Sequence, residues 1–162
     1  MFTHQQVADI CRTYGPRLAP LPNNVDGAQL LWAISGNESS FGTNCAPRHE
    51  AAFDVGGIYG GGAVMKPLLA QFGMSAACSY GPWQILFCNC PAGTTPSDLD
   101  NLDKAAQATV EFLNKLLGRW NPQDLAGIAE CWNAGHPMQN PSAGVARYVS
   151  QLASNYAVPM TT

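Results

Sequence analysis

LLWAISGNESSFG, residues 30–42, joins an apolar run to one isolated acid, and the rest of the chain is best understood from it. The apolar run predicts a helix over about residues 24–37, broken by the Gly-Asn pair at its end. Glu38 follows directly, where the negative end of the helix dipole and apolar neighbours both disfavour a carboxylate. Both effects raise the pKa, as a general acid working near neutral pH requires. A surface Glu in a loop is the alternative.

Helices joined by Gly- and Pro-rich loops account for the rest of the chain. Thr3 and Gln6 form a capping-box pattern for a helix that runs to about Tyr14. Other helices are expected over about 66–72, 97–118, 122–134 and from Ser142 onward. Residues 83–87 form either a short helix or a buried strand, and no stretch alternates with period two. We predict a mainly α fold in one domain, residues 1–162.

The charge composition of the chain limits which kinds of molecule it is expected to bind. Charged residues are 12% of the 162, hydrophobic residues 46%, and the net charge is -3. The eight basic residues are scattered, so we expect no nucleic-acid partner. No run approaches about 18 apolar residues, so no transmembrane segment is expected. Residues 1–10 have neither a basic nor an apolar region of the kind found in signal peptides.

Six cysteines are many for a cytosolic domain. They favour disulfide bonds in an oxidising compartment, although sequence alone gives no pairing. Cys88 and Cys90 are too close together for a usual zinc-ligand pair, and the three histidines are far apart, so we predict no metal site. Buried free thiols remain an alternative. The cysteines are Cys11, Cys45, Cys78, Cys88, Cys90 and Cys131.

Four short motifs occur in a fixed order over roughly residues 34–150. They are Glu38-Ser39-Ser40-Phe41-Gly42, Gly81-Pro82-Trp83-Gln84, Trp132-Asn133-Ala134-Gly135 and Arg147-Tyr148-Val149. The order resembles the lysozyme superfamily, on the side of soluble lytic transglycosylases and goose-type lysozymes. The usual Gly-Leu-Met-Gln is Gly-Pro-Trp-Gln in this chain, and the usual Tyr-Asn-Ala-Gly is Trp-Asn-Ala-Gly. Each variant keeps a bulky side chain and the amide side chain of Gln or Asn. Residues 47–53 are similar to an Arg-aromatic-Glu-Pro-x-aromatic segment of some phage and bacterial lysozyme-like proteins.

The resemblance implies a lysozyme-like helical domain with loops around a substrate cleft, and a role for each matched residue. Glu38 would protonate the glycosidic oxygen, with the Tyr148 hydroxyl near its carboxyl. Gln84 would bind substrate, which would approach the Gly81 backbone closely, and Asn133 would hold an N-acetyl group. Each has a structural alternative: Gln84 or Asn133 as a helix cap, Tyr148 as core. Trp83 and Trp132 are either sugar platforms or core, and Ser39 supports the loop.

A second carboxyl decides the mechanism. A glycosidase normally sets two carboxyls roughly 5 to 9.5 Å apart, and the candidates are Glu50 and Asp54. Lytic transglycosylases need only one, because the acetamido group and 6-hydroxyl of the substrate complete the reaction. We expect Glu50 to be structural or an auxiliary electrostatic group, paired with Arg48, and slightly prefer transglycosylation to hydrolysis.

The expected function is cleavage of the β-1,4 bond between N-acetylmuramic acid and N-acetylglucosamine in peptidoglycan glycan strands. The resemblance implies no cofactor, and we expect a monomer that acts outside the cell, in the periplasm or as a phage-delivered protein. Two alternatives stay open. One is a non-catalytic glycan-binding or phage-structural module of the same fold, and the other is a chitinase- or chitosanase-like enzyme.

Overall fold

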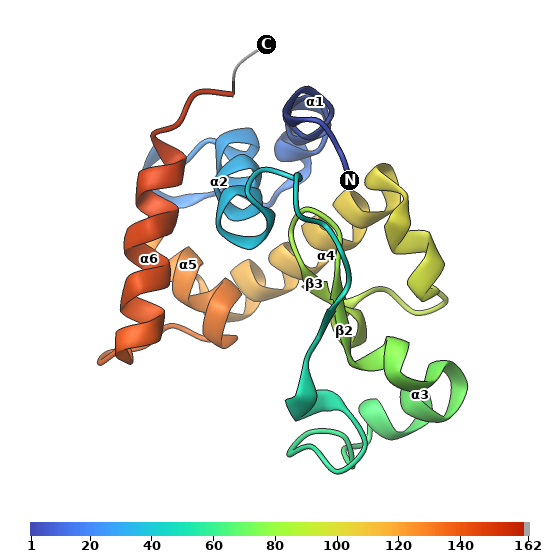
Figure 1. Ribbon diagram of the computed structural model, residues 1–162. Coiled ribbons are helices and arrows are strands. Elements are labelled where there is room, and N and C mark those ends of the chain that lie inside the picture. The colour runs from blue at the N-terminus through green and yellow to red at the C-terminus, as the bar shows by residue number, and fades with distance from the viewer. Residues whose placement is uncertain (161–162) are drawn as a thin grey trace.

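The computed structural model describes residues 1–160, which form a mainly helical protein as predicted (Figure 1). The α-helices are α1 (His4–Tyr14), α2 (Gly27–Ser39), α3 (Met65–Phe72), α4 (Leu102–Trp120), α5 (Leu125–Ala134) and α6 (Ala143–Tyr156). The strands are β1 (Arg48–His49), β2 (Cys78–Tyr80) and β3 (Ile85–Leu86). None of the helices in this described part of the chain is long and apolar enough to cross a membrane.

Capping side chains fix the helix starts that the sequence predicted best. The Thr3 hydroxyl accepts the Gln6 backbone N–H, and the Gln6 side-chain oxygen accepts the Thr3 backbone N–H, so the capping box of α1 is confirmed. Ser142 caps α6 in the same way, accepting from the backbone N–H of Val145. Both signals are local in sequence, so they are visible without the fold.

The helix that carries Glu38 extends two residues further than predicted. Asp26 caps α2, and the helix continues through Gly36 and Asn37 to Ser39. Gly36 does not break the helix. It makes room for packing, because a Cβ there would lie 2.6 Å from the Phe41 ring. Ser40 and Phe41 then take left-handed conformations (φ 52° and 58°), which turn the chain away from the helix end.

Three helix starts lie later in the chain than predicted. The helix expected from about residue 24 begins at Gly27, after its Asp26 cap. A 3-10 turn precedes α4, whose cap is Asn101. The fifth helix begins at Leu125 rather than at Pro122, because the Asp124 side chain accepts the N–H of Gly127 and caps it there.

A small antiparallel sheet lies in the order β1-β2-β3. Arg48 pairs with Ser79, and Ser79 pairs with Leu86 on the other side. The backbone N–H of Glu50 continues the β1 pairing by donating to Ala77 O at 2.8 Å. The sheet therefore fixes the segment that carries Arg48 and Glu50, and resolves residues 83–87 as a turn leading into a buried strand.

Two clusters of buried apolar side chains form the interior. The larger cluster joins α1, α2, α4, α5 and α6. The smaller cluster joins α3, β2 and β3 to one face of α4. In Figure 1, α3 lies at the lower right, away from α1, α2, α5 and α6. Trp132 of α5 packs against both clusters and marks where they meet.

The predicted disulfide bonds are absent: all six cysteines are free thiols in the described part of the chain. Cys11 and Cys131 are buried singly within helices, as small apolar side chains are. Burial raises the pKa of Cys88 to about 11 and that of Cys90 to about 12, so these thiols are uncharged near neutral pH. The number of cysteines does not indicate disulfide bonds in this protein, because a thiol can fill space in the core without a partner.

Candidate active site

Glu38 lies in the last turn of α2, with only 11% of its side chain exposed. Two donors from other helices bind the same carboxyl oxygen, Oε1. The Trp132 indole Nε1 of α5 donates at 3.1 Å, and the Tyr148 hydroxyl of α6 donates at 2.9 Å. Three helices thus converge on one carboxyl group, and they bring together three of the residues that the motifs selected.

Burial dominates the electrostatics of Glu38. Loss of solvent raises the pKa of this carboxyl above its ordinary value, although bonds from Tyr148 and Trp132 and the charge of Arg48 act in the opposite direction. The net direction agrees with the sequence prediction. The larger cause is desolvation by the packed helices, which a motif can only imply.

Arg48 links Glu38 to the second carboxyl. Its guanidinium lies 3.6 Å from Glu38 Oε2 and donates from Nε to Glu50 Oε1 at 2.8 Å. One planar guanidinium therefore contacts both acids, which is compatible with the roughly 5 to 9.5 Å separation of glycosidase pairs. Ser79 Oγ also lies 3.0 Å from Glu50 Oε1, so Glu50 is held by a cation and a hydroxyl.

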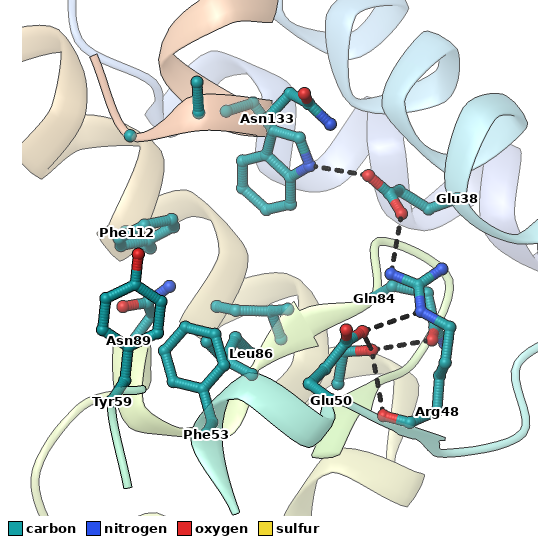
Figure 2. Close-up of a pocket in the computed structure, with 15 residues that line it drawn as sticks. Glu38, Arg48, Glu50, Phe53, Tyr59, Gln84, Leu86, Asn89, Phe112 and Asn133 are labelled. Carbon is teal, nitrogen blue, oxygen red and sulfur yellow. Dashed lines mark hydrogen bonds and ion pairs between the residues drawn. The ribbon is translucent and has the colours of Figure 1, made fainter. Parts of the chain in front are cut away.

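A pocket of about 520 Å³ contains both acids. Figure 2 shows Glu38 on one wall and the Arg48–Glu50 pair on another, with Phe53, Tyr59 and Phe112 farther along. The rings of Phe53 and Tyr59 pack against each other at a tilt, with 4.8 Å between their centroids. The pocket is thus acidic and polar at one end and aromatic at the other, a combination that suits a sugar chain with polar edges and apolar faces.

Gln84 lines the pocket, but its amide is already engaged by the protein. Its Nε2 donates to Gly81 O at 3.0 Å, and its Oε1 lies 3.0 Å from Ser79 Oγ. Its backbone is left-handed, φ 44°. Gly81 itself does not line the pocket. With φ 71° it makes the turn, and a Cβ there would lie 3.2 Å from Ala105 Cβ. We therefore assign both residues to shaping the turn beneath Glu50.

The two tryptophans of the motifs have different environments. Trp83 has no exposed surface, and its Nε1 donates to Leu31 O at 2.9 Å within the larger core. The substrate-binding role expected for Trp83 is therefore corrected: a fully buried ring offers no face to a sugar. Trp132 lines the pocket and binds Glu38, so the second aromatic motif does reach the site.

Asn133 and Tyr148 are the other two matched residues near the site. Asn133 lines the pocket directly and is not the cap of α5, because Gly135 takes the left-handed capping position. Burial and the nearby Glu38 carboxyl raise the pKa of Tyr148 well above its ordinary value. Tyr148 therefore stays a hydroxyl donor at neutral pH, as its predicted place beside Glu38 requires.

Asp54, the other candidate for a second acid, is occupied elsewhere. Its carboxylate accepts the Val55 backbone N–H at 2.7 Å and lies 2.8 Å from His49 Nε2. The backbone bond and then His49 lower the pKa of Asp54, and the residue does not line the pocket. Glu50 is the acid that accompanies Glu38.

Ser39 supports the loop after α2, as predicted. Its hydroxyl lies 2.6 Å from Pro82 O, and it accepts the Gly42 backbone N–H at 2.9 Å. These bonds tie the helix end that carries Glu38 to the turn that carries Gln84.

Several residues of the site carried no signal that we could use. Arg48 was expected to pair with Glu50, but its contact with Glu38 was not foreseen. Ser79 and Tyr59 had no predicted role, and Phe53 was noted only as the last residue of the 47–53 segment. Ser79 lies on a strand of three residues, which is too short to show a readable period. The tilted Phe53–Tyr59 pair lies next to the glycine-rich stretch 56–62, whose composition was the available hint.

A titration of the Glu38 carboxyl carbon by NMR tests its environment independently of any activity. We expect the wild-type pKa to lie above the ordinary value for Glu. Arg48→Gln removes a charge that favours the carboxylate, so the pKa should rise further. Tyr148→Phe removes a donor and should act in the same direction. A Glu38 pKa at or below the ordinary value, or a fall in either variant, would contradict this account.

Residues 1–160 contain no group of three His, Cys, Asp or Glu side chains placed to hold a metal ion. Comparison with protein-family models, with curated proteins and with solved structures finds no match for this chain. The geometry around Glu38 is therefore the basis for assigning a function.

Proposed function

We propose that this protein is a peptidoglycan-degrading glycosidase with a lysozyme-like helical domain and a substrate cleft. It would cleave the β-1,4 bond between N-acetylmuramic acid and N-acetylglucosamine, with Glu38 as general acid. One observation carries the proposal: a nearly buried carboxyl with a raised pKa, held by Trp132 and Tyr148, opens onto a pocket with a second acid. We propose further that it acts as a monomer, outside the cell, in the periplasm or after delivery by a phage.

The bonds around Glu38 indicate which oxygen carries the proton. Trp132 and Tyr148 both donate to Oε1, so the proton of the neutral acid belongs on Oε2. Arg48 lies 3.6 Å from that oxygen. Once Oε2 has given its proton to the glycosidic oxygen, the guanidinium stabilises the carboxylate that remains. The same cation therefore favours the transfer step, while burial keeps the pKa of Glu38 above its ordinary value beforehand.

The second step depends on what attacks the sugar. Glu50 Oε1 already accepts from Arg48 Nε at 2.8 Å and lies 3.0 Å from Ser79 Oγ, so one of its two oxygens is not free to activate a water. The muramic 6-hydroxyl is held in place by its own ring and gains from proximity. We therefore favour lytic transglycosylation slightly, with Glu50 as an auxiliary electrostatic group and hydrolysis as the alternative.

The products of purified peptidoglycan distinguish the two reactions. Transglycosylation should give 1,6-anhydromuramic ends, and mass spectrometry should find these products lighter by one water than hydrolytic products. Glu50→Gln should keep substantial activity, because the substrate supplies the nucleophile. Reducing-end products, together with a Glu50→Gln variant as inactive as Glu38→Gln, would instead identify a two-carboxyl lysozyme.

The two rival functions make different predictions in the same assay. A non-catalytic glycan-binding or phage-structural module would leave peptidoglycan intact. That rival would be favoured by an exposed Glu38 with no pocket around it, whereas Glu38 is 11% exposed and lines a pocket. A chitinase- or chitosanase-like enzyme would cleave purified chitin oligomers at least as fast as peptidoglycan.

A further inference from the structure

A second pocket lies beside the first, on the α6 side of Glu38. It has a volume of about 780 Å³ and is lined by residues of α2, α5 and α6 and of the segment before α6. Asn133 lines both pockets, and Tyr148, which binds Glu38, lines the second. The two pockets therefore adjoin at Asn133, and Tyr148 of the second pocket contacts Glu38 of the first, so a substituent of a chain bound in the first pocket has the second pocket beside it.

The polar groups of this second pocket differ from those of the first. Arg147 is the one charged side chain that lines it, whereas the first pocket holds two carboxyls and one guanidinium. Within residues 1–160 Arg147 forms no ion pair, while Arg48 is paired twice. Gln151 lies one helical turn after Arg147 on α6 and lines the same pocket. The pocket thus combines neutral amides with one unpaired cation.

We propose that this second pocket binds a carboxylate of the muramic residue next to the scissile bond, with Arg147 as its counter-charge. The inference rests on the proposed function and adds a basis for substrate choice. A muramic residue carries a carboxylate on its lactyl arm or on the peptide attached there, whereas chitin carries none. A guanidinium binds carboxylates through two parallel bonds. Arg147 therefore favours muramic strands over chitin.

Binding measured in a Glu38→Gln background tests this inference without turnover. Three ligands of equal sugar length are compared by calorimetry: muramic oligomers with stem peptides, the same oligomers with free lactyl carboxylates, and chitin oligomers. We expect Arg147→Gln to weaken binding of at least one muramic ligand by about fivefold or more, with chitin binding unchanged. Arg147→Lys should restore part of the loss. Arg119→Gln, at the end of α4 and outside both pockets, is the matched control.

The pattern of losses identifies the carboxylate. A loss confined to the peptide-bearing ligand assigns the stem peptide, and a loss with the free lactyl ligand assigns the lactyl arm. Equal losses for all three ligands, no loss for any, or no measurable binding in the parent would overturn the proposed subsite. Cleavage of peptidoglycan by wild-type protein is measured alongside. If that cleavage is absent while Arg147-dependent binding persists, the proposed catalysis fails and the subsite stands.

Discussion

Replacing Glu38 by Gln should reduce turnover of peptidoglycan at least about 10²-fold, the lower end for removal of a general acid. Gln keeps an acceptor for Trp132 and Tyr148, so the helices around it should stay packed. What is lost is the proton that the leaving oxygen needs. Turnover is measured on purified peptidoglycan, with circular dichroism to check the fold and a binding assay to check the pocket.

The same substitution should make the protein more stable at neutral pH. The pKa of Glu38 is higher in the folded protein than in the unfolded chain. Protonated Glu38 therefore contributes fully to the stability of the folded protein at pH values below the pKa of the unfolded chain. That contribution is lost as pH rises through the higher folded pKa, because a carboxylate must then stay desolvated. Removing the charge should therefore raise the melting temperature near pH 7 and change it little in acid.

Glu111→Gln is the control for both measurements, since Glu111 lies on α4 and does not line the pocket. It should keep wild-type turnover and nearly wild-type stability. A Glu38→Gln protein that retains more than about a tenth of wild-type activity would remove Glu38 from the role of general acid. A fall in its stability at neutral pH would show that the folded protein favours the carboxylate.

Replacing Trp83 by Ala should destabilise the protein by about 3 to 5 kcal/mol, the usual cost of emptying a buried aromatic site. Trp83 has no exposed surface, and its indole donates to Leu31 O inside the larger core. The loss combines a cavity with the hydrogen bond from the indole to Leu31 O. For a domain of this size such a change can remove most of the stability.

Trp120→Ala is the matched control, because Trp120 is 37% exposed and lies at the end of α4. Its effect should be below about 1 kcal/mol. Trp83→Phe keeps most of the volume and loses the donor, so it should cost less than Ala and leave a protein that folds. Urea unfolding measures all three. If Trp83→Ala unfolds like wild type but binds glycan poorly, Trp83 is a sugar platform after all.

Local signals explain what the sequence did predict. The capping box at Thr3 and the cap at Ser142 act within one helical turn, and the apolar spacing of the helices follows from the same short range. Glu38 was identifiable because its burial follows from the apolar run before it and its place at a helix end. Its prediction as a candidate acid thus rested on neighbours in sequence as well as on the motif.

Non-local contacts explain what was missed. Arg48 reaches Glu38 only because the two-residue strand β1 pairs with the three-residue strand β2, and nothing in residues 43–64 shows that pairing. Gly36 was predicted to break the helix, but its small size is needed for packing. The Phe41 ring packs against Gly36 only after the chain has turned at the helix end, so the contact cannot be read from the helix sequence itself. Trp83 was ambiguous for the same reason. Whether an aromatic residue faces a core or a pocket depends on elements distant in sequence.

The placement of the pocket between two apolar clusters has a consequence for heat inactivation. Glu38 belongs to a helix of the larger cluster, whereas the segment carrying Arg48, Glu50 and Phe53 packs beside the smaller one. Regions with fewer buried contacts open first, in cooperative units below the global transition. Amide hydrogens of β2 and α3 should exchange before those of α2. Activity should then disappear while the helices of the larger cluster are still folded. The smaller cluster would therefore set the highest temperature at which the protein works.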